Sequence, residues 1–389
     1  MLEHWALDPA IVYLNHGTVG APPRRVLAAQ QAIRDEIERQ PAQFLLRELS
    51  TPPNGVLSRR GRPRQRDAAD AVGAFLGAKG DDLVFVDNAT AGINAVLRSL
   101  TFDPGDEILI TDLGYGAIAN AATYVARAHG AVVRVVSLPF PISDPGAALE
   151  AVVNALTERT RILIVDHITS ETALVLPLAE IAARCRAKGV PVLVDGAHAP
   201  GAIALDIPAL GVDWYTGNLH KWAWSPRSCG VLWCAPARQP ALHPPVISWG
   251  LDHGMLAEFD WVGTRDPSAA LAAPEGIAFM RELGVDAVRA YNHALVWEAA
   301  QWLSKRWGTA LPAPECMIGT MATVPLPEKA GSTKEDGARL KDALLYEDHI
   351  EAQVHALRGR VWVRLSAQIY NDMSDIERLA RAVEARVSR

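Results

Sequence analysis

Cysteine is scarce in this chain. Its 389 residues include four cysteines, which show neither the paired spacing of a metal site nor the pattern of a disulfide framework. We therefore expect no bound metal and a reducing compartment, the cytoplasm. The four are Cys185, Cys229, Cys234 and Cys316.

Long apolar runs and a basic start are also missing. No window approaches the ~20 uninterrupted apolar residues of a membrane-spanning helix. The opening Met1-Leu-Glu-His-Trp5 lacks the basic residues and the apolar stretch of a signal peptide. These absences predict a protein that neither spans a membrane nor carries a secretory leader.

Charge of one sign is not in large excess. The formal net charge is −6, which argues against nucleic acid or an anionic membrane as the main partner. One basic cluster lies among proline, glycine and serine residues, and we expect a solvated or interface loop there rather than a nucleic-acid site. It consists of Arg59, Arg60, Arg62, Arg64 and Arg66.

The composition that remains is that of an ordinary globular protein, with 49% hydrophobic and 21% charged residues. A chain of this length can bury a large core and is expected to form two subdomains. No G-x-G-x-x-G motif follows a predicted strand, which argues against a nicotinamide-dependent dehydrogenase.

From Val72 onward, short apolar strands alternate with amphipathic helices. This alternation predicts an α/β fold with a mainly parallel sheet covered by helices on both faces. Ligands in such sheets bind at the carboxyl ends of strands. Four aspartates fall at predicted strand ends: Asp87, Asp112, Asp166 and Asp195. Aspartate at such positions often only forms a turn, so only Asp195 is singled out. The expected strands are 83–86, 107–111, 132–137, 161–166, 190–195, 212–215 and 230–234, and the expected helices are 91–100, 118–129, 147–156 and 177–188.

After about Thr264 the pattern changes to long helices at 274–282 and 284–307, followed by strands at 321–324 and 361–365. The final helix is expected over 374–386, with Ser374 as its N-cap and Glu377 completing a capping box. This part of the chain predicts a second, smaller α/β domain.

The most informative pattern combines Asp195, which ends an apolar strand, with Lys221, on the loop after the next predicted strand. A carboxylate can keep the pyridine nitrogen of pyridoxal phosphate protonated, and a lysine amine can bind its aldehyde covalently. Taken singly, an aspartate at a strand end is usually a turn former or a helix cap, and a lysine beside a tryptophan is usually a surface residue.

Together, D-G-A-H at 195–198 and H-K-W at 220–222 resemble the class V aminotransferase family of fold-type I pyridoxal phosphate enzymes. The likeness runs from Asn15 to the last helix and is nearest to the isopenicillin N epimerase-like branch, including the segment F-L-L-R-E-L at 44–49. The resemblance implies pyridoxal 5'-phosphate as cofactor. It also implies a large cofactor-binding domain over residues 17–264 with a mainly parallel seven-stranded sheet, and a smaller α/β domain formed by residues 1–16 and 265–389.

The resemblance places the cofactor phosphate at Asn88, Ala89 and Thr90, where a predicted helix begins. Free backbone N–H groups and a hydroxyl at a helix N-terminus suit a phosphate, although Thr90 as a simple N-cap is the alternative. Asn218 and His220, which flank the lysine, match further phosphate ligands of the family.

Other matched positions surround the pyridine ring. Tyr115 matches the aromatic residue that stacks on the ring, a contact worth about 1 kcal/mol, and a buried core tyrosine is the alternative. His198 matches a residue that faces the phenolic oxygen of the cofactor, unless the turn backbone satisfies it. His167 and Ser170 match residues that line the cofactor, although relatives usually have glycine where this chain has Ala173.

Thr264 and Arg265 match a segment that, in the family, reaches the phosphate of the neighbouring subunit's cofactor. The resemblance therefore implies a homodimer whose sites lie at the subunit interface. Without the resemblance, this segment is typical of a loop with an Asp-Pro turn.

Arg364 lies within an otherwise apolar predicted strand, where a charge is costly unless it is paired. A carboxylate offers bidentate geometry, and the family's R-x-S stretch implies that Arg364 holds the substrate α-carboxylate; a structural ion pair is the alternative. Near the amino terminus, Asn15, His16 and Gly17 resemble the family's entry segment and are expected to close over the substrate.

Lys221, Asp195, His198 and Tyr115 are therefore the expected catalytic residues of an enzyme that acts at the α-carbon of an amino acid. We expect proton chemistry of the epimerase or racemase type. A C–S lyase acting on a modified cysteine and an aminotransferase remain alternatives, because nothing in the sequence is specific to one substrate. A non-catalytic pyridoxal phosphate sensor is a further alternative, but no DNA-binding extension is apparent.

A cysteine desulfurase is not expected. Persulfide formation needs a mobile thiolate, and residues 350–360, shortly before Arg364, contain no cysteine. Cys316 lies farther upstream beside a predicted strand and is expected to be a small buried residue.

Overall fold

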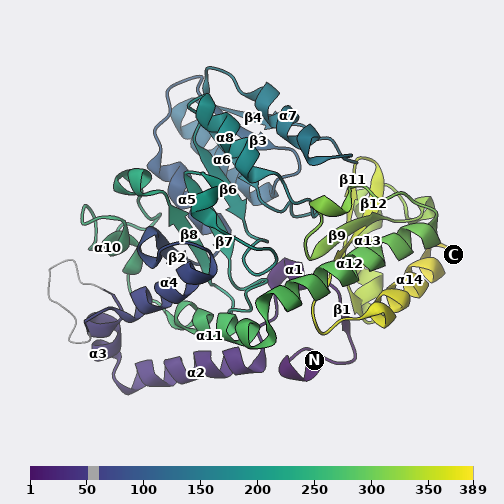
Figure 1. The fold of residues 1–389 in the computed structure, drawn as a ribbon, viewed down its shortest axis with the longest axis horizontal. Helices are drawn as coiled ribbons and strands as arrows, with labels where there is room; N and C mark the ends of the chain where they lie inside the picture. The colour runs from purple at the N-terminus through teal and green to yellow at the C-terminus, as the bar shows by residue number, and fades with distance from the viewer. Residues whose placement is uncertain (51–60, 389) are drawn as a thin grey trace.

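A seven-stranded sheet forms the centre of the computed structural model, which describes residues 1–50 and 61–388. Its strands are β2 (Leu83–Val86), β3 (Glu107–Thr111), β4 (Val132–Val136), β5 (Thr160–Asp166), β6 (Val192–Gly196), β7 (Trp214–Asn218) and β8 (Gly230–Cys234). They lie in the order β2-β8-β7-β6-β5-β3-β4 (Figure 1), and β8 runs antiparallel to both of its neighbours. The other pairs are parallel. The predicted mainly parallel sheet is confirmed.

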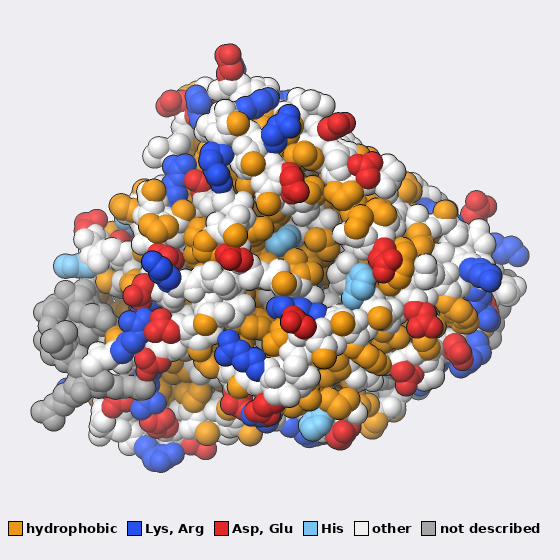
Figure 2. Space-filling view, in the orientation of Figure 1, with side chains coloured by type: hydrophobic (Ala, Val, Ile, Leu, Met, Phe, Trp, Pro, Cys, Tyr) orange, Lys and Arg blue, Asp and Glu red, His pale blue; other side chains and the backbone are white. Residues whose placement is uncertain are grey.

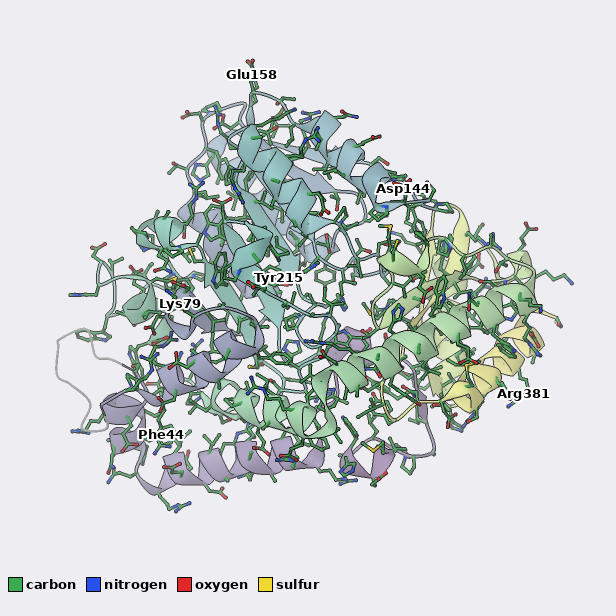
Figure 3. The ribbon with its side chains drawn as sticks, in the orientation of Figure 1. Phe44, Lys79, Asp144, Glu158, Tyr215 and Arg381 are labelled. Carbon is green, nitrogen blue, oxygen red and sulfur yellow. The ribbon has the colours of Figure 1, made fainter. Side chains whose placement is uncertain are left out.

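Helices cover both faces of this sheet (Figure 1) because its strands send alternate side chains into two apolar cores. In β3, Ile108 and Ile110 enter one core and Leu109 the other. The first core is completed by α5 (Ala89–Ser99) and α6 (Gly116–His129), and the second by α4 (Arg64–Phe75), α7 (Pro145–Ala155), α8 (Leu178–Ala187) and α11 (Ser268–Leu283). Figure 3 labels Tyr215 at the centre of the sheet, where it is fully buried.

A three-stranded antiparallel sheet forms the smaller part of the molecule. Its strands β9 (Met321–Pro325), β11 (Gln353–Leu357) and β12 (Arg360–Ser366) lie in the order β11-β12-β9. They share a core with α12 (Val285–Trp307), α13 (Lys334–Tyr346) and α14 (Met373–Val387). The predicted smaller α/β part is confirmed, whereas its division from the large part at residues 16 and 264 stays a prediction.

The amino-terminal segment joins the smaller part. Strand β1 (Val12–Tyr13) pairs in parallel with β10 (Ile350–Glu351), and Leu14 lies in the second sheet's core. An isolated bridge then joins Asn15 to Ser366, and the short helix α1 (His16–Val19) lies between the two parts of the molecule (Figure 1). The remaining helices are α2 (Arg24–Arg39), α3 (Pro41–Gln43), α9 (Ile207–Leu210) and α10 (Met255–Asp260).

The last helix begins differently from the prediction. Its N-cap is Asp372, which forms a capping box with Asp375, so the predicted cap at Ser374 with Glu377 is wrong. The Ser374 hydroxyl donates a hydrogen bond of 2.5 Å to the Asp372 carboxylate. Aspartate accepts more hydrogen bonds than serine does, and here it holds the serine as part of the cap.

Part of the predicted arginine loop is helical. Arg64 and Arg66 lie on α4, and Arg66 is buried with its guanidinium 2.7 Å from the Asp260 carboxylate. The prediction of a solvated or interface loop is wrong for these two residues, because the fold supplies a buried acid that the local sequence does not reveal. Arg59 and Arg60 lie outside the described residues.

The visible surface carries acidic and basic side chains interspersed with one another (Figure 2). Among the helices of residues 1–50 and 61–388, none combines the length and the apolar character needed to cross a membrane.

Candidate active site

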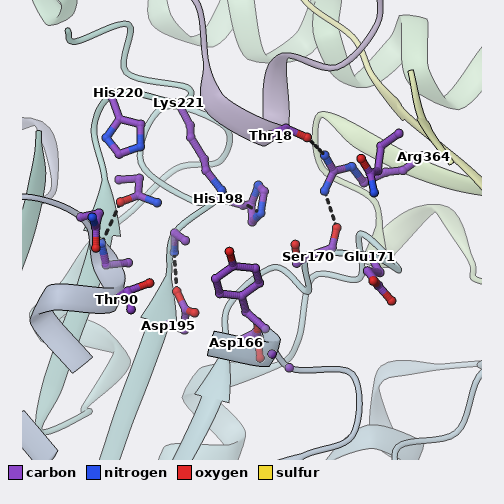
Figure 4. A pocket seen from close by; sticks show the side chains of 18 residues that line it. Thr18, Thr90, Asp166, Ser170, Glu171, Asp195, His198, His220, Lys221 and Arg364 are labelled. Carbon is purple, nitrogen blue, oxygen red and sulfur yellow. Dashed lines mark hydrogen bonds between the residues drawn. The ribbon is translucent and has the colours of Figure 1, made fainter. Parts of the chain in front are cut away.

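A cavity of about 690 Å³ opens where the parallel strands end and the smaller part of the molecule meets them. Figure 4 shows the side chains that project into it. Most of the predicted site residues are among them, together with several that were not predicted. The lining consists of Thr18, Asn88, Ala89, Thr90, Gly114, Tyr115, Gly116, Asp166, Ser170, Glu171, Asp195, Ala197, His198, Asn218, His220, Lys221, Gln353 and Arg364.

Lys221 and Asp195 meet in this cavity, as predicted. Asp195 is the last but one residue of β6 and Lys221 follows β7, the next parallel strand, so both side chains reach the same edge of the sheet (Figure 4). Burial and the charge of Arg364 lower the pKa of the Lys221 amine to about 7, and Asp195 acts in the opposite direction. A large neutral fraction at neutral pH makes this amine both a nucleophile and a base.

The Asp195 carboxylate is buried and accepts a hydrogen bond of 3.0 Å from the backbone N–H of Ala197. Burial raises its pKa, while that N–H and the charge of Lys221 lower it. A buried carboxylate with one hydrogen bond is stabilised further by a cation, and a protonated pyridine nitrogen is such a cation.

His198 contacts the lysine amine, with its Nε2 3.2 Å from Lys221 Nζ. Burial lowers the pKa of His198 well below its usual value, so the ring is neutral. When the lysine amine donates to Nε2, Nδ1 carries the ring hydrogen. Within the described residues this buried Nδ1 has no hydrogen-bond partner.

The N-terminus of α5 forms a cradle of backbone N–H groups at the cavity wall. Asn88 accepts from the N–H of Ala91 at 2.9 Å, and Asn218 accepts from the N–H of Ala89 at 2.8 Å. In the described parts of the chain, the N–H and hydroxyl of Thr90 make no hydrogen bond. These two donors and the helix dipole favour an anion at this place.

His220 lines the cavity beside this cradle. Its Nδ1 lies 3.0 Å from the carbonyl oxygen of Cys229. Because a carbonyl only accepts, Nδ1 carries the hydrogen, and burial lowers the pKa of the ring to about 4. A phosphate dianion bound next to His220 would favour the protonated ring.

Tyr115 precedes α6 as its N-cap, and 49% of its surface is exposed. This exposure contradicts the alternative of a buried core tyrosine. The ring lies in the cavity wall between two glycines, Gly114 and Gly116, and is open to contact with a flat ligand.

Arg364 lies at the other end of the cavity from Thr90 and His220 (Figure 4). Its Nη1 donates to the carbonyl of Ser170, and its Nη2 donates to the Thr18 hydroxyl at 2.8 Å. Burial lowers its pKa to about 10, which leaves it charged at neutral pH. Among the residues the structure describes, Nε has no partner and no carboxylate contacts the guanidinium. The structural ion pair is therefore not found, and a buried cation of this kind favours an anionic ligand.

Three predicted residues lie behind the cavity rather than in it. His167 is buried with its Nδ1 2.8 Å from the Tyr215 hydroxyl. His16 is fully buried, and its ring nitrogens lie 2.9 Å from the Tyr370 hydroxyl and from the backbone carbonyl of Lys221. A Cβ on Gly17 would lie 2.4 Å from a methionine sulfur, so this glycine allows a close approach of chains.

The remaining predicted residues either contact the cavity indirectly or lie outside it. Asn15 reaches the cavity through Arg364, whose Nη2 donates to its side-chain oxygen at 3.1 Å. Thr264 is exposed and outside the cavity lining, and the neighbouring Arg265 lies 3.7 Å from the Asp87 carboxylate of the same chain. A contact of this segment with a second subunit stays a prediction.

Sequence reasoning missed Asp166, Thr18, Glu171 and Gln353, which all line the cavity. Asp166 lies at the end of a predicted strand, but aspartate is also common in turns at such positions, so the sequence did not single it out. Thr18 directly follows the predicted entry residues 15–17 but was not itself singled out. Glu171 and Gln353 come from segments that only the tertiary fold brings together, and no local motif marks them.

Cys316 is exposed, so the prediction of a small buried residue is wrong. It lies on a short turn before β9, and that turn is not part of the cavity lining. A three-residue turn at the surface leaves its middle side chain outside the core, although the neighbouring Met317 is buried.

The sequence profile of the class-V aminotransferase family matches residues 56–379. The chain belongs to this family. One relative, the probable L-cysteine desulfhydrase, chloroplastic, of Arabidopsis thaliana, is 33% identical over 98% of this chain and 84% of its own length. Isopenicillin N epimerase of Streptomyces clavuligerus is 34% identical over 97% of this chain and 96% of its own length.

Solved structures share the fold. The apo cysteine desulfurase of Thermococcus onnurineus NA1 has a TM-score of 0.78 at 19% identity, over 100% of this chain and 97% of that chain. A C-DES variant with glycine covalently linked to its PLP cofactor has a TM-score of 0.77 at 22% identity, over 99% of each chain. The fold-type I architecture is thereby confirmed, and this family member is an enzyme that uses pyridoxal 5'-phosphate.

The residues of the cavity fit this cofactor. A buried amine with a lowered pKa, a buried carboxylate, a half-exposed aromatic ring and a helix N-terminus with free donors all face one space. These are the groups that an aldehyde, a pyridine nitrogen, a flat ring and a phosphate require.

Proposed function

We propose that this enzyme removes the α-proton of an L-amino acid and releases a thiol from its β-carbon, as a C–S lyase acting on cysteine or a modified cysteine. The observation that supports the proposal is the placement of Lys221 and Arg364 in one cavity. A base for the α-proton and a cation for the α-carboxylate are the two groups this chemistry needs.

We assign the cofactor contacts to the predicted residues. In the resting enzyme Lys221 would hold the aldehyde carbon, Asp195 would keep the pyridine nitrogen protonated, and Tyr115 would contact the ring. His198 would lie near the phenolic oxygen. Thr90, Asn218 and His220 would hold the phosphate.

When bound, pyridoxal phosphate withdraws electrons and makes the α-proton of the substrate acidic. The Lys221 amine, once the substrate amine has replaced it on the aldehyde carbon, is free to take that proton from Cα, as its lowered pKa allows. The electron pair forms a Cα–Cβ double bond as the Cβ–S bond breaks, and the proton returns to the leaving sulfur. Arg364 fixes the α-carboxylate and so orients the Cα–H bond toward the amine.

One base suffices for this elimination, and Lys221 is the one lysine in the described lining of the cavity. The relatives named L-cysteine desulfhydrases support the same reaction. The described cysteines do not line the cavity, and burial raises the pKa of three of them, Cys185, Cys229 and Cys234. We therefore still expect no protein-bound persulfide.

Epimerisation at Cα is the second candidate. It is favoured by the match to isopenicillin N epimerase, which this chain covers over 96% of that protein's length. Epimerisation requires a second proton donor on the opposite face of the substrate, and the described lining does not identify one.

The assembly and the compartment belong to the same proposal. We propose a cytoplasmic homodimer in which Thr264 and Arg265 approach the phosphate bound by the neighbouring subunit. Analytical ultracentrifugation measures the assembly, and Arg265→Ala should weaken cofactor retention if the segment reaches that phosphate.

The activity test uses the holoenzyme with L-cysteine and with single enantiomers of other amino acids in D₂O. We expect sulfide, pyruvate and ammonia from L-cysteine. A D-enantiomer with deuterium at Cα and no sulfide would favour epimerisation instead. Alanine with a persulfide on Cys316 would identify a desulfurase, and a keto acid formed only with a second keto acid present would identify an aminotransferase.

A further inference from the structure

Two buried carboxyl groups lie side by side at the floor of the cavity. Asp166 ends β5 and Asp195 is the last but one residue of β6, and the two residues are direct partners in the parallel register. They are 6% and 3% exposed, and both line the cavity (Figure 4). Two buried carboxylates at paired register positions repel each other when both are charged, which favours a proton on one of them.

The surroundings decide which of the two holds it. Asp195 has the hydrogen bond from the Ala197 N–H and the positive charge of Lys221 to favour its charged form. Asp166 is favoured in its charged form by its own backbone N–H and that of Tyr115, but no cation is among the groups that act on it. Burial and the negative charge of Asp195 together raise the pKa of Asp166 well above its usual range.

A hydroxyl lies near Asp166 without a partner. A cavity of about 10 Å³ beneath Tyr115 is lined by Thr111, Asp166 and Asp195, and it has room for about one water. The Thr111 hydroxyl is buried and has no hydrogen-bond partner among the described residues. A Cβ on Gly114 would lie 3.1 Å from Asp166 Oδ2 and 3.4 Å from Thr111 Oγ1, so both oxygens converge under the loop that carries Tyr115.

We propose that Asp166 is a positioning residue that stays protonated: it supports the Tyr115 loop as a neutral acid and leaves the single negative charge on Asp195. The inference rests on the proposed function, in which Asp195 meets the pyridine nitrogen. A second negative charge on Asp166 would be buried without a cation, because the one cofactor nitrogen is already matched by Asp195.

Matched substitutions in the holoenzyme test the assignment. Asparagine has the shape and the donor of a protonated aspartate, so Asp166→Asn should keep kcat within about threefold of wild type and leave the absorbance maximum of the bound cofactor unchanged. The corresponding substitution at the neighbouring acid, Asp195→Asn, should lower kcat about a thousandfold while the cofactor stays bound.

The two possible failures are distinguishable. A loss of about a hundredfold or more in Asp166→Asn, with Asp195→Asn also inactive, overturns the assignment of the proton and leaves the proposed function standing. Full activity in Asp195→Asn overturns the proposed role of Asp195 itself.

A spectroscopic measurement on the wild-type holoenzyme detects the proton directly and does not depend on a variant that folds. Infrared spectra of protein labelled with carbon-13 aspartate, taken at about pH 8, should show the carbonyl stretch of a protonated carboxylic acid. At that pH Asp260, whose pKa is raised to about 6, is ionised. The band should vanish in Asp166→Asn and persist in the control Asp112→Asn. A missing wild-type band, or one that survives in Asp166→Asn, overturns the proposal.

Discussion

The two ends of the cavity are built in different ways. At the cofactor end, the side chains lie at or just after the ends of the strands of one sheet: Asn88 follows β2, Asp195 is the last but one residue of β6 and Lys221 follows β7. At the substrate end, the hydrogen bonds from Arg364 to Asn15 and Thr18 span 349 and 346 positions of the sequence. One end is therefore set by the sheet, and the other by how the amino-terminal segment meets the smaller part of the molecule.

This difference separates two kinds of function. A group carried by the rigid sheet keeps its geometry when distant parts of the chain change, which suits the covalent chemistry of a cofactor. A group assembled from distant segments depends on their packing and can change without disturbing the cofactor. Substitutions at the two ends should therefore affect different measured quantities.

The largest effect is expected at the cofactor end. Lys221→Ala removes the amine that binds the aldehyde and moves the α-proton, so turnover should fall below detection. Borohydride reduction of the wild-type enzyme should attach cofactor to the peptide that contains Lys221, and mass spectrometry of the digested protein identifies that peptide. Lys188→Ala, at an exposed lysine on the large part, is the control and should keep both signals. Cofactor trapped on any other lysine would contradict the assignment.

Arg364→Lys tests the substrate end. Lysine cannot reproduce the planar fork of arginine, so KM for the amino-acid substrate should rise about a hundredfold, equivalent to ~2.7 kcal/mol, with cofactor content unchanged. Steady-state kinetics and the cofactor absorbance measure the two quantities separately. Arg386→Lys, in a partly exposed ion pair with Glu347, is the matched control. An equal loss of cofactor would place Arg364 at the cofactor end and remove the distinction between the two ends.

The same difference explains what could be predicted from the sequence. Strands β6 and β7 are buried on both faces and therefore appear as apolar runs, and the groups at or after their ends, Asp195 and Lys221, follow from that pattern. Glu171 and Gln353 could not be predicted, because their place in the cavity depends on tertiary packing. For the same reason the expected contact of His16 with a substrate is not seen: its ring is fully occupied by Tyr370 and a backbone carbonyl.

Burial itself was the other quantity that the sequence did not reveal. Asp166 and Asp112 both follow strands, yet Asp166 is buried and Asp112 pairs with Arg358 at the surface. Arg66 was expected in a loop and is buried beside an acid, whereas Cys316 was expected in the core and is exposed. In each case the neighbours come from another part of the chain.

Acid sensitivity should be detectable behind the substrate end. His355 lies on β11, the strand that begins with the lining residue Gln353, and burial lowers its pKa from 6.5 to about 4. Between these values the unfolded chain binds a proton that the folded protein does not, so folding stability rises with pH in this window and is lost as pH falls. From pH 6.5 to 5 the loss is about 1.6 kcal/mol, because the unfolded histidine is already half protonated at pH 6.5.

His355→Phe should remove that loss. Neither ring nitrogen of His355 has a hydrogen-bond partner among the described residues, so phenylalanine breaks no such bond. Urea unfolding at pH 6.5 and at pH 5 should show a smaller decrease in the free energy of unfolding for the variant than for the wild type. Equal decreases would show that His355 does not stay neutral in the folded state.

The smallest effect is expected in the loop that joins the two ends of the cavity, at Ala173. Its φ of 58° lies in the left-handed region, which costs an L-residue about 1–2 kcal/mol. Ala173→Gly relieves that strain. It also raises the conformational entropy of the unfolded chain, which costs about 0.4–1 kcal/mol of stability, and removes a buried methyl group worth about 0.8 kcal/mol. The terms nearly cancel, so the free energy of unfolding should change by less than about 0.5 kcal/mol.

The matched control is Ala182→Gly, a buried alanine on helix α8 with no left-handed strain to relieve, where about 1.5–2 kcal/mol should be lost. Denaturant unfolding of both variants measures the contrast, and an equal loss at the two positions would show that the backbone at Ala173 is not strained.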